Sequence, residues 1–335
     1  MSIEVNNDPC AATPSDYKMT WTSAAQAMWA AVKLAGKAEL ELYEVMGLTG
    51  HAFRININPE NVDIAGPTAY PWETFFAKGL KNIGFNTAYV RTADFTPPTP
   101  DQLTRALKLV QKSIDRGVPA ISWDLFVPEF GVLYGYNDEK QELQGKDPNE
   151  DGTLLYEKLG RGQIHELFVM ILEEEIQTTA LSLIRGALEI AIDHAHRREH
   201  SNETPPFQNG LAGYDGWIEA FEAGKVSEIG NAYNLAVVAD ARAHAAKFLQ
   251  EMADRWESDG NWGEAVVLIT RGAAGHYART TDALNTLLAV FPFPQGGEPN
   301  DAETAKKAIA VLQTAKAAEA SGVEALERLL AELPE

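Results

Sequence analysis

The sequence predicts an α+β fold, with a central antiparallel sheet packed on a buried helix at 1–174 and an all-α helical bundle domain at 175–335. Two short apolar runs, at 118–123 and 130–136, are typical of neighbouring strands in the middle of a packed sheet. Helical and strand patterns alternate before residue 174, whereas only helical periodicity follows it. A chain of 335 residues also exceeds what one core usually serves, so we expect two domains.

The first predicted helix, at 19–36, is apolar on most of its faces and should be buried. Thr22 or Ser23 is the expected N-cap, and Gly36 is the expected C-terminal stop. A polar meander with turn signals is expected between the central strand pair and the last strand. The other elements predicted before residue 174 are helices at 39–46, 72–84 and 100–117, and strands starting near Phe53, at 85–92 and at 164–172.

The second domain has helical periodicity and a high alanine content throughout. Three segments rich in Pro, Gly, Asn or Asp interrupt it: TPPFQNG, SDGN and FPFPQGGEPND. An antiparallel bundle is the fold class that this pattern favours. Its helices are predicted at about 176–200, 212–224, 229–257, 262–290 and 301–333.

The composition bounds the partners that we expect. A formal charge of −20 repels phosphate backbones and anionic lipid headgroups, which argues against nucleic acid and membrane surfaces as partners. The single cysteine, Cys10, cannot form a disulfide within the chain, and no window offers about 18 uninterrupted apolar residues. We therefore expect a cytoplasmic protein. The sequence has no Gly-rich phosphate loop, GxSxG or CxxC motif in a suitable place, and we predict no cofactor.

The order of elements in the first domain resembles the papain-like cysteine peptidase fold. The stretch 19–36 followed by FGVLYGYND at 130–138 is similar to the bacterial branch that includes double-glycine leader peptidases and the butirosin biosynthesis protein H-like N-terminal domain. The motifs TGHAFRINI, YGYND, GYDGWIEAF and FPFP also resemble a bacterial family that joins such a domain to a helical tail. The resemblance implies a nucleophilic cysteine at the start of the buried helix and a histidine at the start of the strand that ends in the GYN turn. A thiolate there would be stabilised by the helix dipole and activated by the imidazole.

The chain departs from this pattern at both catalytic positions. The start of the helix falls on Trp21, Thr22 or Ser23, and the histidine position falls on Glu129. The resemblance therefore implies either a pseudoenzyme that keeps the cleft or a different chemistry. Ser23 or Thr22 could act as an oxygen nucleophile if a base lay within about 3 Å, but both are also ordinary N-cap residues.

Further candidate residues lie on turns and strands near the expected cleft. His51 follows a glycine in a tight turn, where its ring could face a pocket or bind backbone. Asp124 and Glu129 flank the central turn and could form a carboxylate pair with a raised pKa, usable as a general acid or base. They could equally be solvated ends of strands. Trp21 is a further candidate ligand contact. Trp123, Tyr134 and Tyr136 could line the cleft or fill the core.

One helix face in the second domain carries a weak metal pattern. Asp193, His196 and His200 lie at spacings that could supply zinc ligands, but a solvated helix end with cations near its C-terminus is the better account. Asp240 and His244, four residues apart, are expected to form a pair that supports the bundle.

Two functions follow as hypotheses. The first is a degenerate papain-like domain that binds a small molecule or peptide without Cys/His catalysis, with the helical half as a lid or a homodimer surface. The second is an acyl- or peptidyl-transferring hydrolase with a rewired site of Ser23 and His51. A structural partner protein that works through the alanine-rich helices is a third reading.

Overall fold

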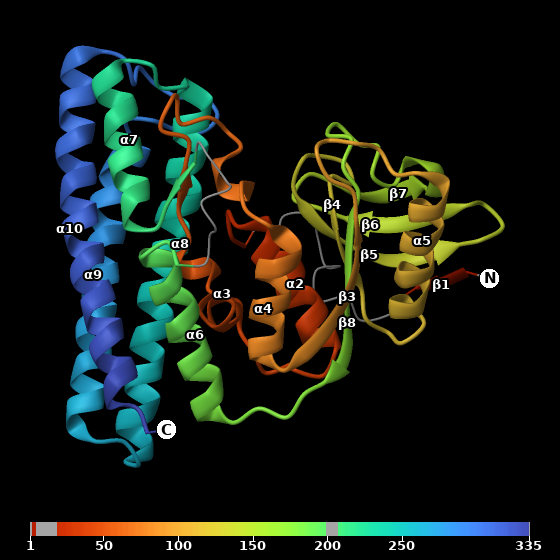
Figure 1. The fold of residues 1–335 in the computed structure, drawn as a ribbon, viewed down its shortest axis with the longest axis horizontal. Coiled ribbons are helices and arrows are strands. Elements are labelled where there is room, and N and C mark those ends of the chain that lie inside the picture. The colour runs from red at the N-terminus through yellow and green to blue at the C-terminus, as the bar shows by residue number, and fades with distance from the viewer. Residues whose placement is uncertain (1, 5–18, 199–206, 335) are drawn as a thin grey trace. The chain divides into compact units, whose positions relative to one another are not determined.

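The computed structural model describes residues 2–4, 19–198 and 207–334 and confirms the mixed α+β fold with a helical C-terminal region. Its described residues divide into two compact units (Figure 1). The first comprises Met1–Val45 and Phe76–Thr178, and the second comprises Met46–Phe75 and Thr179–Glu335. The change from sheet to helices thus falls at residues 178–179. Residues 46–75, which the sequence pattern places in the first domain, group with the helices.

The first unit is built on an antiparallel sheet with strand order β3-β8-β4-β5-β6-β7, and β1 pairs with β5. The predicted central pair, β4 and β5, does lie in the middle of this order, with Trp123 opposite Phe130. The strands are β1 (Ser2–Glu4), β3 (Phe85–Arg91), β4 (Ala120–Trp123), β5 (Phe130–Asn137), β6 (Glu142–Lys146), β7 (Asp151–Leu155) and β8 (Phe168–Glu175).

Helices cover both faces of this sheet. Figure 1 shows α5 (Pro100–Ile114) on one face and α2 (Ser23–Leu34) with α4 (Trp72–Ile83) on the other. On the first face, Ala106 and Val110 of α5 are fully buried in a cluster with Leu133 and Val169. On the other face, Phe76 of α4 contacts the rings of Phe130 and Phe168. Both faces are buried, as the apolar strand runs predict.

Local signals placed the ends of several helices correctly. Thr99 caps α5 with a capping box to Gln102, and Pro100 occupies the first turn, where its missing N–H costs nothing. The helix predicted at 39–46 is α3 (Leu42–Leu48). Two predictions in the second half of the sheet were wrong. The polar meander contains strands β6 and β7, and the last strand starts at Phe168 rather than near residue 164.

The second unit is helical except for a two-stranded ladder. Its helices are α6 (Ala180–Ala195), α7 (Leu211–Ala223), α8 (Glu228–Asp259), α9 (Glu264–Leu288) and α10 (Ala302–Glu332). Helices α7 to α10 agree with their predicted ranges to within two residues, whereas α6 is shorter than the predicted 176–200 because it starts only after the N-cap Thr179 and ends at Ala195. The ladder joins β2 (Asn56–Ile57) to β9 (Gln208–Asn209). Ile55 and Ile57 pack into the same core as Trp217, Leu235 and Leu312, so this segment is part of the helical core.

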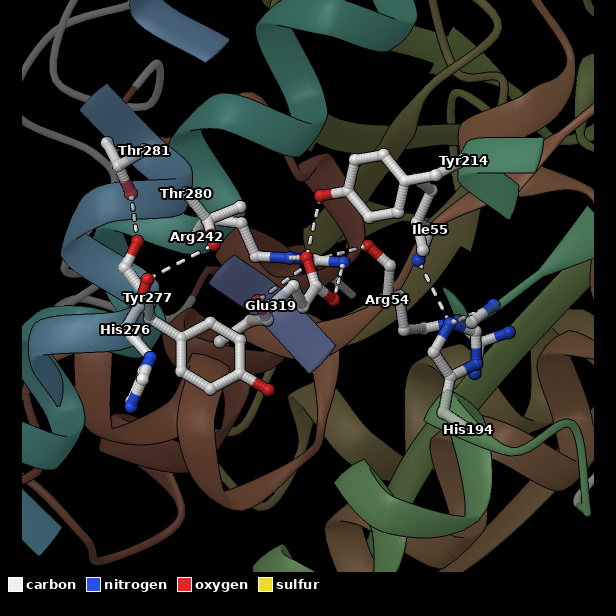
Figure 2. A network of polar contacts seen from close by, with 12 residues as sticks. Arg54, Ile55, His194, Tyr214, Arg242, His276, Tyr277, Thr280, Thr281 and Glu319 are labelled. Atoms are coloured by element: carbon white, nitrogen blue, oxygen red, sulfur yellow. Dashed lines mark hydrogen bonds and ion pairs between the residues drawn. The ribbon is translucent and has the colours of Figure 1, made fainter. Parts of the chain in front are cut away.

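A buried ion pair crosses the helical unit. Arg242 on α8 and Glu319 on α10 are 0% and 3% exposed, and their side chains form two N–H···O bonds of 2.7 Å each (Figure 2). Tyr214 donates to the same carboxylate at 2.6 Å. Arg242 also donates to the carbonyl oxygens of Ala52 and Arg54, at 3.2 and 2.8 Å. The guanidinium thereby holds the 3₁₀ turn His51–Phe53 and its C-cap against the helices.

Within the described residues, no helix is both long enough and apolar enough to cross a membrane.

Candidate functional site

The first unit assembles its most notable polar contacts at the start of α2. Thr22 is the N-cap residue, and its carbonyl accepts from the N–H groups of Ala25 and Gln26. Its side chain makes no capping bond, and the hydroxyl oxygen is shielded from solvent without a hydrogen-bond partner among the described residues. Ser23, the first helical residue, is only 5% exposed. Thr22 therefore occupies the expected N-cap position through its backbone, but its side chain does not cap the helix.

The two positions where the papain-like pattern expects cysteine and histidine are in direct contact. The Ser23 hydroxyl donates to the Glu129 carboxylate, with Oγ 2.5 Å from Oε2. The same Oγ accepts from the backbone N–H of Phe130 at 3.1 Å. Ser23 thus joins the start of α2 to the start of β5, across 106 residues of sequence. The hydroxyl has a hydrogen-bond partner both as donor and as acceptor.

The turn between β4 and β5 carries Asp124 and Glu129 at its two ends. The backbone N–H of Asp124 donates to the carbonyl of Glu129 at 2.9 Å, which closes the turn just beyond the Trp123–Phe130 pair. Asp124 has a φ of 52°, a left-handed conformation that Asp tolerates better than most residues. Asp124 and Glu129 therefore lie side by side at the end of the β4–β5 ladder, and the left-handed conformation takes Asp124 out of the regular strand.

Asp124 is buried, so it is not a solvated strand end. It is 3% exposed, and its Oδ2 accepts from the N–H of Ile164 at 2.5 Å. Burial raises the pKa of this carboxyl, and the negative charge of Asp147 adds to the rise, while the backbone N–H groups of Ile164 and Gln163 counteract it. Oδ1 is shielded from solvent and has no hydrogen-bond partner among the described residues.

The contact with Asp124 also explains why the last strand starts late. Ile164 turns its N–H toward the carboxylate instead of a neighbouring strand. At Gly162 a Cβ atom would lie 2.5 Å from the Asp124 carbonyl oxygen and 2.6 Å from its carboxyl carbon, so only glycine allows this approach. The loop before β8 is therefore shaped by the buried acid.

Asp147 is a site residue that the sequence reasoning missed. It is fully buried, and its Oδ2 accepts from the N–H groups of Phe126 and Val127 at 2.8 and 2.9 Å. Its Oδ1 accepts from Asn149 and Glu150 at 2.8 and 3.0 Å. One carboxylate thus holds both the β4–β5 turn and the β6–β7 turn. The only signal in the sequence was the Asp-Pro pair, which predicts a turn but not a long-range contact.

The aromatic candidates separate into core and surface. Trp123 is 5% exposed and packs against Phe130 at 4.8 Å between ring centroids, so it fills the core. Tyr136 is also buried and donates to Asp115 at 2.8 Å, while Tyr134 donates to Asp151 on β7 at 2.5 Å. Trp21 differs from these because it is 43% exposed and lies two residues before Ser23.

His51 belongs to the second unit, in the 3₁₀ turn that Arg242 holds. It is 2% exposed, with Nδ1 2.8 Å from the Thr49 hydroxyl and its ring edge-to-face with Phe75 at 4.9 Å. In its own unit it is a packed histidine. Within the first unit, the group that contacts Ser23 is Glu129, and the pairing of Ser23 with His51 stays a prediction.

The weak metal pattern on α6 has other contacts. His196 lies 2.8 Å from Glu327, Asp193 lies 3.4 Å from Arg198, and His200 falls outside the described residues. Across the described part of the chain, no group of three His, Cys, Asp or Glu residues is placed to hold a metal ion. The Asp240–His244 pair does form, at 3.8 Å, and burial lowers the pKa of His244.

Neither the known protein-family models nor the curated proteins contain a match to this chain.

Proposed function

We propose that the first unit is a degenerate papain-like domain that binds a small molecule or peptide beside the start of α2, without Cys/His catalysis. The observation that carries this proposal is the double engagement of the Ser23 hydroxyl by Glu129 and the Phe130 N–H. Ser23 is 5% exposed, and its hydroxyl both donates and accepts a hydrogen bond, so it links α2 to the start of β5. In this proposal, the residue at the nucleophile position has a structural role.

The chemistry of the pair supports a loss of the ancestral activity. A serine hydroxyl needs a base to remove its proton as it attacks, and an ordinary carboxylate is a much weaker base than imidazole. The Phe130 N–H also donates to Oγ and draws electron density from it, which lowers its nucleophilicity.

Support for binding comes from the surface next to this contact. Trp21 and Met19 are 43% and 50% exposed and lie two and four residues before Ser23 in the chain. Trp presents a large flat apolar area with an N–H donor, which suits it to a peptide or a small organic molecule. We expect the ligand to lie against Trp21 and the half-buried end of the β4–β5 turn.

A thermal-shift screen with acyl, amine and peptide metabolites tests the proposal. A ligand should raise the melting temperature of the wild type and should not be turned over. Trp21→Ala should abolish the shift, whereas Tyr89→Ala should not, because Tyr89 is equally exposed at 47% but lies on β3. A screen without any stabilising ligand, or equal losses in both variants, would contradict the proposal.

A rebuilt dyad tests the papain-like resemblance itself. In a Cys10→Ser background, Ser23→Cys with Glu129→His would place a thiol and an imidazole in contact. The thiol should then react with iodoacetamide faster at pH 6 than in the matched Ser23→Cys variant that keeps Glu129. A carboxylate disfavours the thiolate, whereas an imidazolium favours it. Equal rates would argue against the resemblance.

The 2.5 Å contact also favours a second candidate function, an acyl-transferring hydrolase that uses Ser23 and Glu129. Oγ would attack an acyl carbonyl while its proton passes to Glu129, and the leaving alcohol or amine would take that proton as its bond to the acyl carbon breaks. Water would then attack the serine ester and give a proton to Glu129, which returns it to Oγ as the carboxylic acid is released. Ester hydrolysis and fluorophosphonate labelling that both disappear in Ser23→Ala would support this function. Wild type that neither hydrolyses nor labels would exclude it.

A further inference from the structure

His194 lies at a junction in the helical unit where its Nε2 atom can only accept hydrogen bonds. It is the penultimate residue of α6 and is 1% exposed. Its Nε2 is 3.0 Å from the backbone nitrogen of Ile55 and 3.3 Å from that of Gly210 (Figure 2 shows the first contact). Backbone N–H groups are donors only, so Nε2 must carry its lone pair and the ring must be neutral.

Both amides belong to the short β2–β9 ladder. Ile55 directly precedes β2 and Gly210 directly follows β9, and the Gly210 N–H also lies 3.2 Å from the Ile55 carbonyl oxygen. His194 therefore closes one end of a ladder with only two residue pairs. A two-residue ladder has little stability of its own, so its anchoring depends on such contacts.

The backbone is closely packed at this junction. A Cβ atom at Gly210 would lie 2.2 Å from the His194 carbonyl oxygen and 2.5 Å from that of Ala195. The chain therefore approaches the end of α6 at a distance that only glycine permits. A proton on Nε2 would face the backbone nitrogen atoms of Ile55 and Gly210, which lie at 3.0 and 3.3 Å and carry protons of their own.

The two helix ends at the junction have opposite effects on a positive charge at the His194 ring. The N-terminus of α7, which starts directly after Gly210, disfavours a positive ring, whereas the C-terminus of α6 favours it; each effect is typically about 0.3–1 kcal/mol. Burial disfavours the charged form of the ring, which is 1% exposed, and adds to the effect of the two N–H groups. The elements around the junction carry these charged or titratable side chains: His51 and Arg54 before β2, Arg185, Glu189 and Asp193 on α6, Arg197 after it, Tyr214, Asp215, Glu219 and Glu222 on α7, Arg242 on α8, and Glu319 and Glu327 on α10.

We propose that His194, with the amides of Ile55 and Gly210, forms an acid-sensitive latch that holds the β2–β9 ladder closed. Protonation of Nε2 removes the acceptor of both bonds and opens the ladder, which releases one anchor of the segment that contains β2. The Arg242 bonds to Ala52 and Arg54 remain, because neither the guanidinium nor the carbonyl groups titrate in this range. The opening is therefore local.

Hydrogen exchange of the full chain, followed by mass spectrometry and corrected for intrinsic rates, tests the latch. The described amides of residues 54–58 and 207–211 should lose about tenfold of their protection from pH 7.5 to 5.5, because opening is coupled to one proton and a freed histidine has an ordinary pKa of about 6.5. His194→Gln keeps a carbonyl acceptor and cannot titrate, so its protection should not change with pH. His196→Gln is the matched control, because His196 is exposed and pairs with Glu327, and it should behave as wild type.

Two outcomes would overturn the latch: constant protection in the wild type, or loss of the acid response in His196→Gln. Should His194→Gln fail to fold, nitrogen NMR of the wild-type imidazole replaces it. Nε2 should then have the shift of an unprotonated nitrogen at pH 7.5 and should titrate together with the amides of Ile55 and Gly210. A protonated Nε2 at pH 7.5 would refute the proposal.

Discussion

The buried Arg242–Glu319 pair offers the sharpest test of how the helical unit is held together. Burial alone lowers the pKa of the Arg242 guanidinium, but the charge of Glu319 and the contact with Tyr214 outweigh it, and the pKa is raised. Glu319→Leu would leave a fully buried cation with only two backbone carbonyls as acceptors. Removing one partner of a buried pair typically costs about 3–5 kcal/mol. That is a large share of the roughly 5–15 kcal/mol by which domains are stable.

The double variant Arg242→Met with Glu319→Leu separates pairing from packing. Because both charges are removed together, no ion is left uncompensated, and the double variant should be clearly more stable than either single variant. Urea unfolding followed by far-UV circular dichroism measures this through the transition of the helical unit. Arg271→Met, which removes an exposed cation paired with Asp254 and Glu257, is the control and should leave the midpoint unchanged. Additive losses, or a single-variant cost below about 1 kcal/mol, would refute the reasoning.

Three further predictions concern the first unit. Asp147→Asn leaves an amide facing N–H donors and should cost about 2–4 kcal/mol in urea unfolding; an unchanged midpoint would contradict its role in both turns. Ser23→Ala should cost about 1–3 kcal/mol, since it leaves the Phe130 N–H and the Glu129 carboxylate without their shared partner, and a stabilised variant would argue against the link. Burial raises the pKa of Asp124 above 3.8, so its ionisation destabilises the fold as pH rises. Asp124→Asn should therefore gain stability relative to wild type between pH 4 and pH 7, and a relative loss would contradict the sign.

Much of the secondary structure could be predicted because its causes are local. The start of α5 follows from Thr99 and Pro100, while its last residue is Ile114 instead of the predicted Gly117. The central pair β4–β5 follows from two apolar runs around one turn. Strands β6 and β7 were missed because many of their residues are polar or glycine. The Asp147 contact that ties the turn between them to the β4–β5 turn joins residues about 20 positions apart.

The candidate site could be predicted only in part. Ser23 and Glu129 were placed by a resemblance, but their hydrogen bond spans 106 residues and no local pattern contains it. His51 was expected beside the same cleft, yet residues 46–75 group with the helical unit. Arg242 and His194 hold that segment through backbone atoms, which have the same chemistry at every residue and leave no mark on the sequence.

The sequence by itself determined the fold class, the approximate positions of the helices and the central strand pair, because periodicity, caps and breakers act within a few residues. Only the tertiary structure decided which polar groups meet. Burial selected the partners of Ser23, Asp147, Arg242 and His194, since a polar atom removed from water must find a hydrogen bond wherever the packed chain brings one within reach.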